Sequence, residues 1–272
     1  MILYTFCPTV SKHLSFRQLE LPASYQTLDF IADMHLDAGH PHTFAAWRHY
    51  MQDSPADAIF MLGDLFETWV GDDILKAPYP SGDFERQCMA VIAQAAHGRR
   101  IYFMHGNRDF ALSSYAASLA HMQKLADPTL LRWQGQHAIL THGDLLCIDD
   151  VNYQKYRRIV HNRIFQRVAL LLPLKTRMAA AQKIRRKSEA TKKSNRPSIM
   201  DVNTDEVKRW LDTAQTSLMI HGHTHRPADH SLPDGKQRIV LTDWDLDNET
   251  NPRAQVLRWQ AGQKLQRISL AG

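Results

Sequence analysis

The sequence predicts an α/β protein whose first half is a βαβαβ unit. Short apolar runs recur along the chain, helix-like segments separate the first of them, and a cluster of polar side chains follows each run directly. Continuous apolar runs of about four to six residues are typical of strands buried on both faces. The expected strands are Thr27–Ala32, Ala58–Leu62, Ile101–Met104, Ala138–Thr141 and Leu218–Ile220.

Helices are expected between the first three strands. One covers Thr43 to about Asp53, and the second covers Asp83 to His97, where Gly98 is suited to end a helix. Further strands are expected later in the chain, at Arg238–Leu241 and Ala254–Trp259. Before the first strand, residues 1–26 show no clear period, so they are interpreted as an N-terminal extension.

Length and composition exclude several classes of protein. The chain has 272 residues, of which 44% are hydrophobic and 22% charged, as in ordinary globular proteins. No run approaches the roughly 18 apolar residues that span a bilayer, and the N-terminus lacks the pattern of a secretory signal. The three cysteines are far apart, so neither a disulfide framework nor a zinc knuckle is expected. We therefore expect a cytoplasmic protein that does not span the membrane.

Positive charge is concentrated in one segment. Residues 151–200 hold 14 Lys and Arg against the single acid Glu189, whereas the rest of the chain holds 19 basic and 27 acidic residues. Apolar residues interleave with these cations at near-helical spacing up to Pro173, and a second helix is expected from Leu174 to about Lys187. A basic amphipathic pair of helices suits an anionic lipid surface, although a solvated face or packing on the core is the ordinary alternative.

Five polar clusters lie at the ends of the expected strands. In open α/β sheets ligands bind beyond the carboxyl ends of the strands, where successive loops converge. Each cluster alone is a weak signal, but together they supply two carboxylates, four imidazoles and one amide. Such a set of nitrogen and oxygen ligands without thiolate predicts a pair of divalent ions such as manganese, iron, zinc or magnesium. The predicted ligands are Asp33, His35, Asp64, Asn107, His142, His223 and His225.

The ordered set of motifs resembles the calcineurin-like metallophosphoesterases. The motifs are D-x-H, G-D, G-N-R-D, a single H and G-H-x-H, and the resemblance extends from about Thr27 to Pro227. It implies a two-sheet sandwich flanked by helices, with residues 27–150 and 200–272 as the core and residues 151–199 as a helical cap. It also implies that Asp64 bridges two ions, one held with Asp33, His35 and His225, the other with Asn107, His142 and His223.

Longer strings are similar to one family within that group, the UDP-2,3-diacylglucosamine pyrophosphohydrolases of lipid A synthesis. The matching strings begin at Gly63, His105, His142, Ile199 and His221. This resemblance implies a catalytic group of Asp64, Asn107, Arg108 and His142. It implies substrate contacts from Asn107, Arg108, Asp150, Ser188, Lys192, Asn195 and His223. The family pattern Ser-x-x-x-Asn-x-x-Lys has its last two residue types exchanged here, at Lys192 and Asn195.

The implied reaction is attack of a hydroxide, activated by two divalent ions that are expected to be Mn²⁺, on the α-phosphate of UDP-2,3-diacylglucosamine. The products would be UMP and 2,3-diacylglucosamine 1-phosphate. A lipid substrate implies a monomer bound peripherally to the anionic cytoplasmic face of the inner membrane, with no nucleic acid as partner. The alternatives are a dimetal phosphodiesterase or pyrophosphatase acting on a soluble nucleotide, a non-catalytic interaction scaffold, and nucleic-acid binding by the basic segment.

Overall fold

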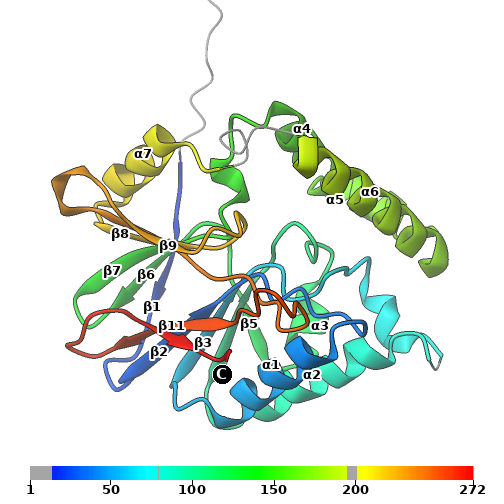
Figure 1. The fold of residues 1–272 in the computed structure, drawn as a ribbon, viewed down its shortest axis with the longest axis horizontal. Helices are drawn as coiled ribbons and strands as arrows, with labels where there is room; N and C mark the ends of the chain where they lie inside the picture. The colour runs from blue at the N-terminus through cyan, green and yellow to red at the C-terminus, as the bar shows by residue number, and fades with distance from the viewer. Residues whose placement is uncertain (1–13, 79, 195–200, 272) are drawn as a thin grey trace, which may run out of the picture.

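The computed structural model describes residues 14–78, 80–194 and 201–271, with the backbone alone for residues 163 and 186–194. Two six-stranded sheets face each other, and helices cover their outer faces (Figure 1). One sheet contains, in spatial order, β12 (Gln266–Ser269), β11 (Gln255–Gln260), β2 (Thr27–Ile31), β3 (Ala58–Leu62), β4 (Arg100–Met104) and β5 (Met122–Lys124). The other contains β1 (Arg17–Glu20), β6 (Thr129–Trp133), β7 (Gln136–Leu140), β8 (Leu218–His221), β10 (Gln237–Val240) and β9 (Ala228–Ser231).

The two sheets pack through alternate residues of their strands. Successive side chains of a strand point to opposite faces, so each central strand contributes to two layers. Phe30 of β2 and Phe60 of β3 stack with ring centroids 5.0 Å apart, in one buried cluster with Leu131 of β6 and Ile220 of β8. This cluster fills the space between the sheets, and it explains why the sequence shows continuous apolar runs rather than alternation.

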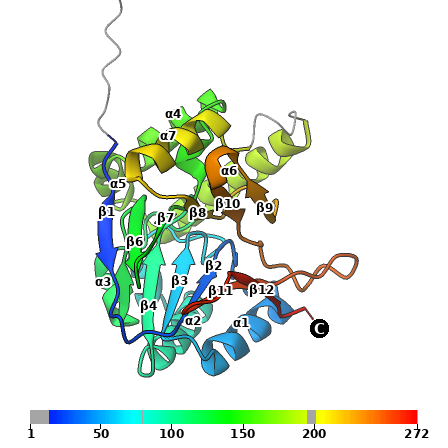
Figure 2. The same cartoon turned by 90° about the vertical axis from the view of Figure 1, so that its left-hand side faces the viewer.

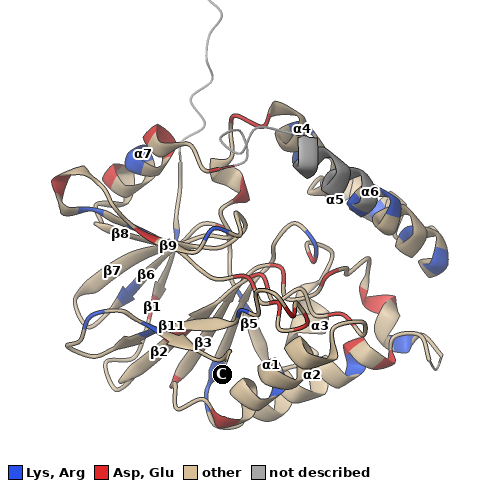
Figure 3. Ribbon diagram, viewed as in Figure 1, with Lys and Arg blue, Asp and Glu red and all other residues tan. Residues whose placement is uncertain are grey.

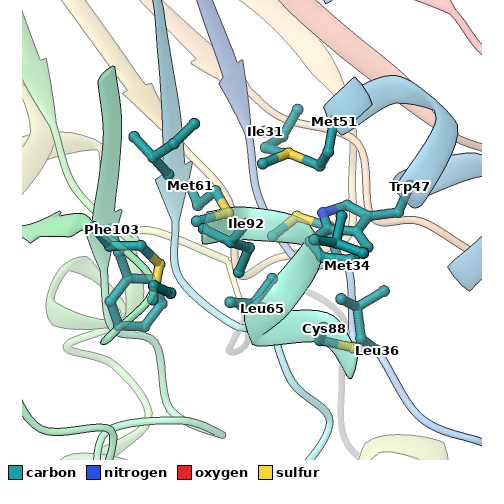
Figure 4. Packing of buried hydrophobic residues seen from close by; sticks show 14 of the residues in the cluster. Ile31, Met34, Leu36, Trp47, Met51, Met61, Leu65, Cys88, Ile92 and Phe103 are labelled. Atoms are coloured by element: carbon teal, nitrogen blue, oxygen red, sulfur yellow. The ribbon is translucent and has the colours of Figure 1, made fainter. Parts of the chain in front are cut away.

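The opposite face of the first sheet is covered by α1 (Pro41–Asp53) and α2 (Asp83–Ala95). Figure 4 shows Met61 of β3 and Ile92 of α2 in the middle of the hydrophobic cluster on this face, with Phe103 of β4 at one end and Trp47 of α1 at the other, all of them buried. On the second sheet, α7 (Thr204–Ala214) buries Trp210 in the same way. The predicted α/β sandwich with flanking helices is therefore confirmed, as are the two helices expected between the first strands.

The remaining elements are short or belong to the inserted segment. The helix α3 (Ser114–Leu119) precedes β5, and single turns of 3-10 helix form η1 (Asp72–Lys76), η2 (Asp144–Leu146) and η4 (Pro233–Gly235). Part of the predicted N-terminal extension belongs to a sheet, because β1 pairs in parallel with β6. The four residues of β1 are mostly exposed, so they lack the apolar run that marks the central strands.

The inserted segment forms three helices, α4 (Val151–Val160), α5 (Arg163–Ala169) and α6 (Leu174–Ser194). The prediction of one continuous helix up to Pro173 was wrong. The side chain of Asn162 accepts hydrogen bonds from the backbone N–H groups of Ile164 and Phe165, so it caps a new helix in the middle of the amphipathic pattern. In both views these helices lie above the loops that follow β2, β3 and β4 (Figure 1 and Figure 2).

None of the helices within the described ranges combines the length and the apolar character that a bilayer crossing requires.

Candidate functional site

The loops after β2, β3, β4, β7 and β8 meet at one edge of the two sheets. They carry all seven predicted metal ligands, and the structure brings these side chains into one group. Figure 3 shows Asp and Glu gathered in the loops at this edge and Lys and Arg along α6 above them. The parallel pairing of β2, β3 and β4 explains the convergence, because their carboxyl ends lie side by side.

Asp33 stands at the centre of two sets of potential ligands. One contains Asp33, His35 and His225, the other Asp33, Asp64 and His142, and the ligand atoms in each lie within 4.8 Å of one another. The Nε2 atoms of His35 and His225 are 3.2 Å apart. His225 Nε2 lies 3.7 Å from Asp33 Oδ1, and His142 Nε2 lies 3.8 Å from Asp64 Oδ2.

The other two predicted ligands, Asn107 and His223, also belong to this group. The Oδ1 atom of Asn107 lies 3.2 Å from Nε2 of His142 and 2.9 Å from Nδ1 of His223. His35 Nε2 lies 4.0 Å from Asp64 Oδ2, so Asp64 faces histidines of both proposed ion sites. The residue common to both sets of potential ligands is Asp33, and the bridging role of Asp64 stays a prediction.

The donor set fits divalent ions. Nδ1 of His142 faces the carbonyl of Leu62 at 3.0 Å, Nδ1 of His35 faces Glu67 at 2.9 Å, and Nδ1 of His225 faces Asp243 at 3.3 Å. A partner at Nδ1 fixes the ring and leaves the lone pair of Nε2 for a metal. Among the described residues, the buried Oδ1 of Asp33 has no hydrogen-bond partner. The side chains thus offer inward-facing atoms that a cation would satisfy.

The electrostatics of the group also favour a cation. Burial raises the pKa of Asp33, which is fully buried beside Asp64. Burial lowers the pKa of His142, but the neighbouring carboxylates, above all Asp64, outweigh burial and raise this pKa to about 9. The raised pKa favours the protonated form of His142, whose positive charge stabilises the neighbouring carboxylates. A divalent ion would supply that charge and compensate the buried carboxylates directly.

The backbone around the ligands is strained. Five predicted ligands have positive φ, namely Asp33 at 54°, His35 at 47°, Asp64 at 52°, His223 at 70° and His225 at 52°. Residues other than glycine rarely adopt this conformation, and such strain concentrates at functional sites. These turns aim side chains from the strand ends at one point.

Two glycines near the candidate ligands leave no room for a side chain, because the carboxylates of Asp64 and Asp33 lie too close to them. A Cβ atom on Gly106 would overlap the carboxylate and backbone nitrogen of Asp64, and one on Gly222 would overlap the carboxylate of Asp33. Asp109 adds a further link, since its carboxylate accepts hydrogen bonds from Leu65 N at 2.8 Å and Gly106 N at 2.7 Å. The loops after β3 and β4 are therefore fixed to each other.

Glu67 is a central residue that sequence reasoning missed. Its Oε1 lies 2.9 Å from both Arg108 Nη1 and Arg185 Nε, and its Oε2 faces His35. Burial raises the pKa of Glu67, but His35 and the two guanidinium groups lower it to about 2 overall. Glu67 followed Gly63-Asp64 in the matching string, which was the only signal of its importance.

Asp243 and Asp144 were also missed as supporting residues. Asp243 holds His225 and accepts hydrogen bonds from Arg253. Asp144, which is 2% exposed, accepts from Tyr153 Oη at 2.9 Å and from Arg157 Nε at 2.6 Å. Asp243 follows β10 and no sequence motif marked it, whereas Asp144 lies in the H-G-D string.

A cavity of about 850 Å³ connects this group to the inserted helices. One end is polar, with Asp64, Asn107, Arg108 and His223. The other end is lined by apolar side chains of α4, α5 and α6 and of the loop after β4, including Phe110, Leu112, Ile159, Phe165, Leu170, Leu172 and Ile184. The site therefore combines polar side chains beside the candidate metal ligands with an apolar lining from the inserted helices.

The predicted substrate residues are placed unequally. Asn107, Arg108, His223 and Asp150 line the cavity, and Asp150 also caps α4 by accepting from Tyr153 N at 2.9 Å. The side chains of Ser188 and Lys192 and the whole of Asn195 lie outside the described residues. Arg185, one turn before Ser188, lines the cavity and contacts Glu67.

Comparison with known proteins identifies the family of this chain. The model of the family "Calcineurin-like phosphoesterase" matches residues 27–227. A UDP-2,3-diacylglucosamine hydrolase of Pasteurella multocida is 42% identical over 79% of this chain and 89% of its own. Another, of Ralstonia nicotianae, is 40% identical over 86% of this chain and 89% of its own. A dimetal phosphatase of Danio rerio has a TM-score of 0.47 at 11% identity, covering 90% of this chain and 95% of that one. By the family match and the sequence identities, the chain belongs to the calcineurin-like phosphoesterase family, together with relatives named UDP-2,3-diacylglucosamine hydrolase.

Proposed function

We propose that this protein hydrolyses the pyrophosphate bond of UDP-2,3-diacylglucosamine. Water adds to the α-phosphate, and the bond to the bridging oxygen breaks, releasing UMP and 2,3-diacylglucosamine 1-phosphate. The observation that carries the proposal is the cavity itself, which joins the candidate metal ligands to an apolar space under α4, α5 and α6. The names of the relatives that are about 40% identical support the same substrate.

The resemblance implies two divalent ions, and the nitrogen and oxygen donors found here suit Mn²⁺. Such ions, when bound, lower the pKa of water and balance the charge of the phosphoryl oxygens. We assign Asp64, His142 and Asn107 to holding them, together with Asp33, His35, His223 and His225. These side chains are fixed by carbonyl and carboxylate partners before substrate arrives, so little reorganisation is needed during the reaction.

Arg108 is assigned to the substrate pyrophosphate. Its guanidinium group lines the cavity beside Asn107 and is held by Glu67 at 2.9 Å. A planar guanidinium can donate two parallel hydrogen bonds to a phosphate, which orients the group as well as attracting it. Arg185 approaches the same carboxylate from α6 and places a second cation at the mouth of the polar end.

The apolar part of the cavity is assigned to the acyl chains. Each buried CH₂ contributes about 0.8 kcal/mol, so two chains in this space would supply much of the binding energy. A soluble nucleotide would leave Phe165, Leu170 and Ile184 without a function in the site. The cavity therefore favours a lipid over the alternative of a soluble phosphodiester.

The outer surface of the insertion is assigned to an anionic membrane. Leu171 is 84% exposed and Ile164 71%, and the cations Arg158, Arg167 and Lys175 are exposed near them in sequence. Apolar side chains beside cations suit peripheral binding at the cytoplasmic face of the inner membrane. We expect a monomer, and we expect no nucleic acid as partner.

The deciding experiment is an assay of UMP release from UDP-2,3-diacylglucosamine with and without added Mn²⁺. We expect release with Mn²⁺, loss of release after chelation, and loss in Asp64→Ala at every Mn²⁺ concentration. Bis(p-nitrophenyl) phosphate serves as a second substrate without lipid. If the wild-type protein cleaves this diester with Mn²⁺ but releases no UMP from the lipid nucleotide, the substrate assignment is wrong while the hydrolytic site stands.

A further inference from the structure

A second pocket adjoins the candidate metal ligands His35 and His225. It has a volume of about 220 Å³ and is formed by the loop after β2, the start of α1 and the loop after β10. It shares Glu67, Arg108, Arg185 and His225 with the large cavity. The rest of its lining is mainly polar, so it differs in character from the apolar space under the insertion. Its size suits a fragment of a ligand rather than a whole lipid.

Three residues in this lining hold buried polar atoms without partners. Within residues 14–78, 80–194 and 201–271, no hydrogen-bond partner is found for Nε1 of Trp244, Oδ1 of Asp243 or Nδ1 of His40. Trp244 and Asp243 are each only 3% exposed. An unpaired buried donor or acceptor costs free energy, and such atoms are rare in folded proteins. The residues of this lining thus include a neutral N–H donor, a carboxylate acceptor and an imidazole nitrogen, the last 3.8 Å from Asp37 Oδ1, that a polar ligand could satisfy.

The walls of this pocket are fixed to the metal-ligand loops. The backbone N–H of Trp244 donates to the carbonyl of Asp33 at 3.0 Å. The carboxylate of Asp247 accepts from the N–H groups of His42 at 3.0 Å and Thr43 at 2.9 Å, which ties the loop after β10 to the start of α1. A ligand here would meet preformed polar atoms at a set distance from the reacting phosphate.

The chemistry of the substrate demands a space in this position. The α-phosphate that is attacked carries the ribose on one oxygen and the lipid phosphate on another. When the lipid part occupies the large cavity, the ribose and base leave the same phosphorus in a different direction. The small pocket adjoins the same arginines and the same histidine, and its unpaired atoms match the hydroxyl, carbonyl and N–H groups of a nucleoside rather than an acyl chain.

We propose that this pocket binds the nucleoside of the substrate, with Trp244 and His40 as specificity-determining residues. The inference rests on the proposed function, since it takes the substrate to be a nucleoside diphosphate lipid. It places the acyl chains in the large cavity and the nucleoside in the small pocket, and the two spaces share Arg108, Arg185 and His225. Asp243 contributes here through its free oxygen while its other oxygen faces Arg253.

The test compares UMP with methyl phosphate, which is the same phosphomonoester without the nucleoside. Both are titrated into the full chain with Mn²⁺ present, and calorimetry gives the ratio of the two affinities. We expect UMP to bind at least about tenfold more tightly, and Trp244→Phe and His40→Ala each to reduce that ratio by about three- to tenfold, as the loss of one hydrogen bond does.

The matched control is Trp47→Phe. Trp47 is also a buried tryptophan whose Nε1 lacks a partner among the described residues, but it lines neither cavity. It should leave the ratio at the wild-type value. Because methyl phosphate reports on the metal site within the same variant, damage to that site changes both affinities and leaves the ratio readable.

Equal affinity for UMP and methyl phosphate in the wild type overturns the pocket assignment, and so does an unchanged ratio in both Trp244→Phe and His40→Ala. Either result leaves the proposed reaction standing if the same preparation releases UMP from the lipid nucleotide. Conversely, absence of that release with a high, variant-sensitive ratio removes the lipid substrate and retains a nucleoside pocket.

Discussion

The loops at the strand ends are fixed mainly by backbone conformation and backbone hydrogen bonds. The inserted helices, by contrast, contact the core through pairs of side chains. The ligand loops have five positive-φ residues, glycines at close approaches, and Asp109 joining two loops by backbone hydrogen bonds. The insertion is attached through pairs such as Arg157 with Asp144, Arg177 with Asp73 and Arg185 with Glu67. The candidate ligands are thereby fixed within the sheets, while the insertion is attached to the core through ion pairs between side chains.

The largest effect is expected from breaking the ion pair between Arg157 of α4 and Asp144 of the core. Arg157→Ala leaves Asp144 buried without its cation, and removal of one partner of a buried pair costs about 3–5 kcal/mol. We expect a loss of that order in the free energy of unfolding, measured with urea at neutral pH. Arg158→Ala, on the exposed side of the same helix, should stay within about 0.5 kcal/mol of wild type.

This ion pair should also depend on pH. Burial raises the pKa of Asp144, but Arg157 and the nearby histidines outweigh burial and hold it well below its usual range. Because the folded-state pKa is the lower one, the stabilisation is present above about pH 4 and disappears as pH falls further. The difference between wild type and Arg157→Ala should therefore shrink on acidification. A constant difference down to pH 3 would contradict the assigned ion pair.

The ligand loops can be tested by adding a single methyl group. Gly106→Ala places a Cβ against Asp64, and displacement of a reacting group by about 1 Å can cost about 10²-fold in rate. We expect that loss for bis(p-nitrophenyl) phosphate as well as for the lipid nucleotide. Gly98→Ala is the matched control, since its Cβ meets no atom within 4 Å among the described residues. Retained turnover in Gly106→Ala would show that these loops yield more easily than their geometry indicates.

Glu67 belongs to both regions, so its loss should affect both. Glu67→Gln keeps the shape but removes the charge that His35, Arg108 and Arg185 share, and loss of such a supporting carboxylate typically costs about 10–100-fold in metal affinity or activity. Calorimetric titration with Mn²⁺ measures the effect on affinity. Asp53→Asn, which breaks a surface pair with His49, should leave Mn²⁺ affinity unchanged. Equal affinities in wild type and Glu67→Gln would remove Glu67 from the metal site.

The smallest effect is expected at the outer surface of the insertion. Leu171→Ser removes part of the about 1.5–3 kcal/mol that burial of a leucine contributes, so we expect a loss of about three- to tenfold in binding to phosphatidylglycerol vesicles. Cosedimentation measures this binding. Leu119→Ser is the control, because Leu119 is an exposed leucine of α3, outside the insertion. Equal losses in the two variants would argue that the insertion is not the surface that meets lipid.

The sequence was sufficient to predict the ligand group because that group depends on local pattern. Each predicted ligand follows a buried strand in a turn, and parallel strands end at the same edge whatever their order. Asp33 and His225 follow strands of different sheets, so the rule that loops meet at carboxyl ends places each at the end of its own sheet, and the packing of the two sheets brings them together. The first two helices were equally predictable, since their apolar periods are unbroken.

The supporting contacts were not predictable because they depend on sheet order and helix register. Asp243 meets His225 only because β10 lies beside β8, which no local pattern states. Arg157 belongs to the basic segment that was expected to suit a lipid surface, but its side chain, in the last turn of α4, faces Asp144. The break between α4 and α5 was not predicted because the amphipathic spacing continues across it. The side chain of Asn162 caps the start of α5 there.

The shared carboxylate of Glu67 has a consequence for which anions the protein can admit. Both guanidinium groups already face a negative oxygen, so an arriving phosphate must displace a resident partner instead of filling an empty cationic patch. Free phosphate and sulfate make no further contacts that would compensate for the lost ion pairs with Glu67. A molecule that also carries hydrocarbon chains and a nucleoside does, and we expect this internal competitor to exclude simple inorganic anions from the entrance.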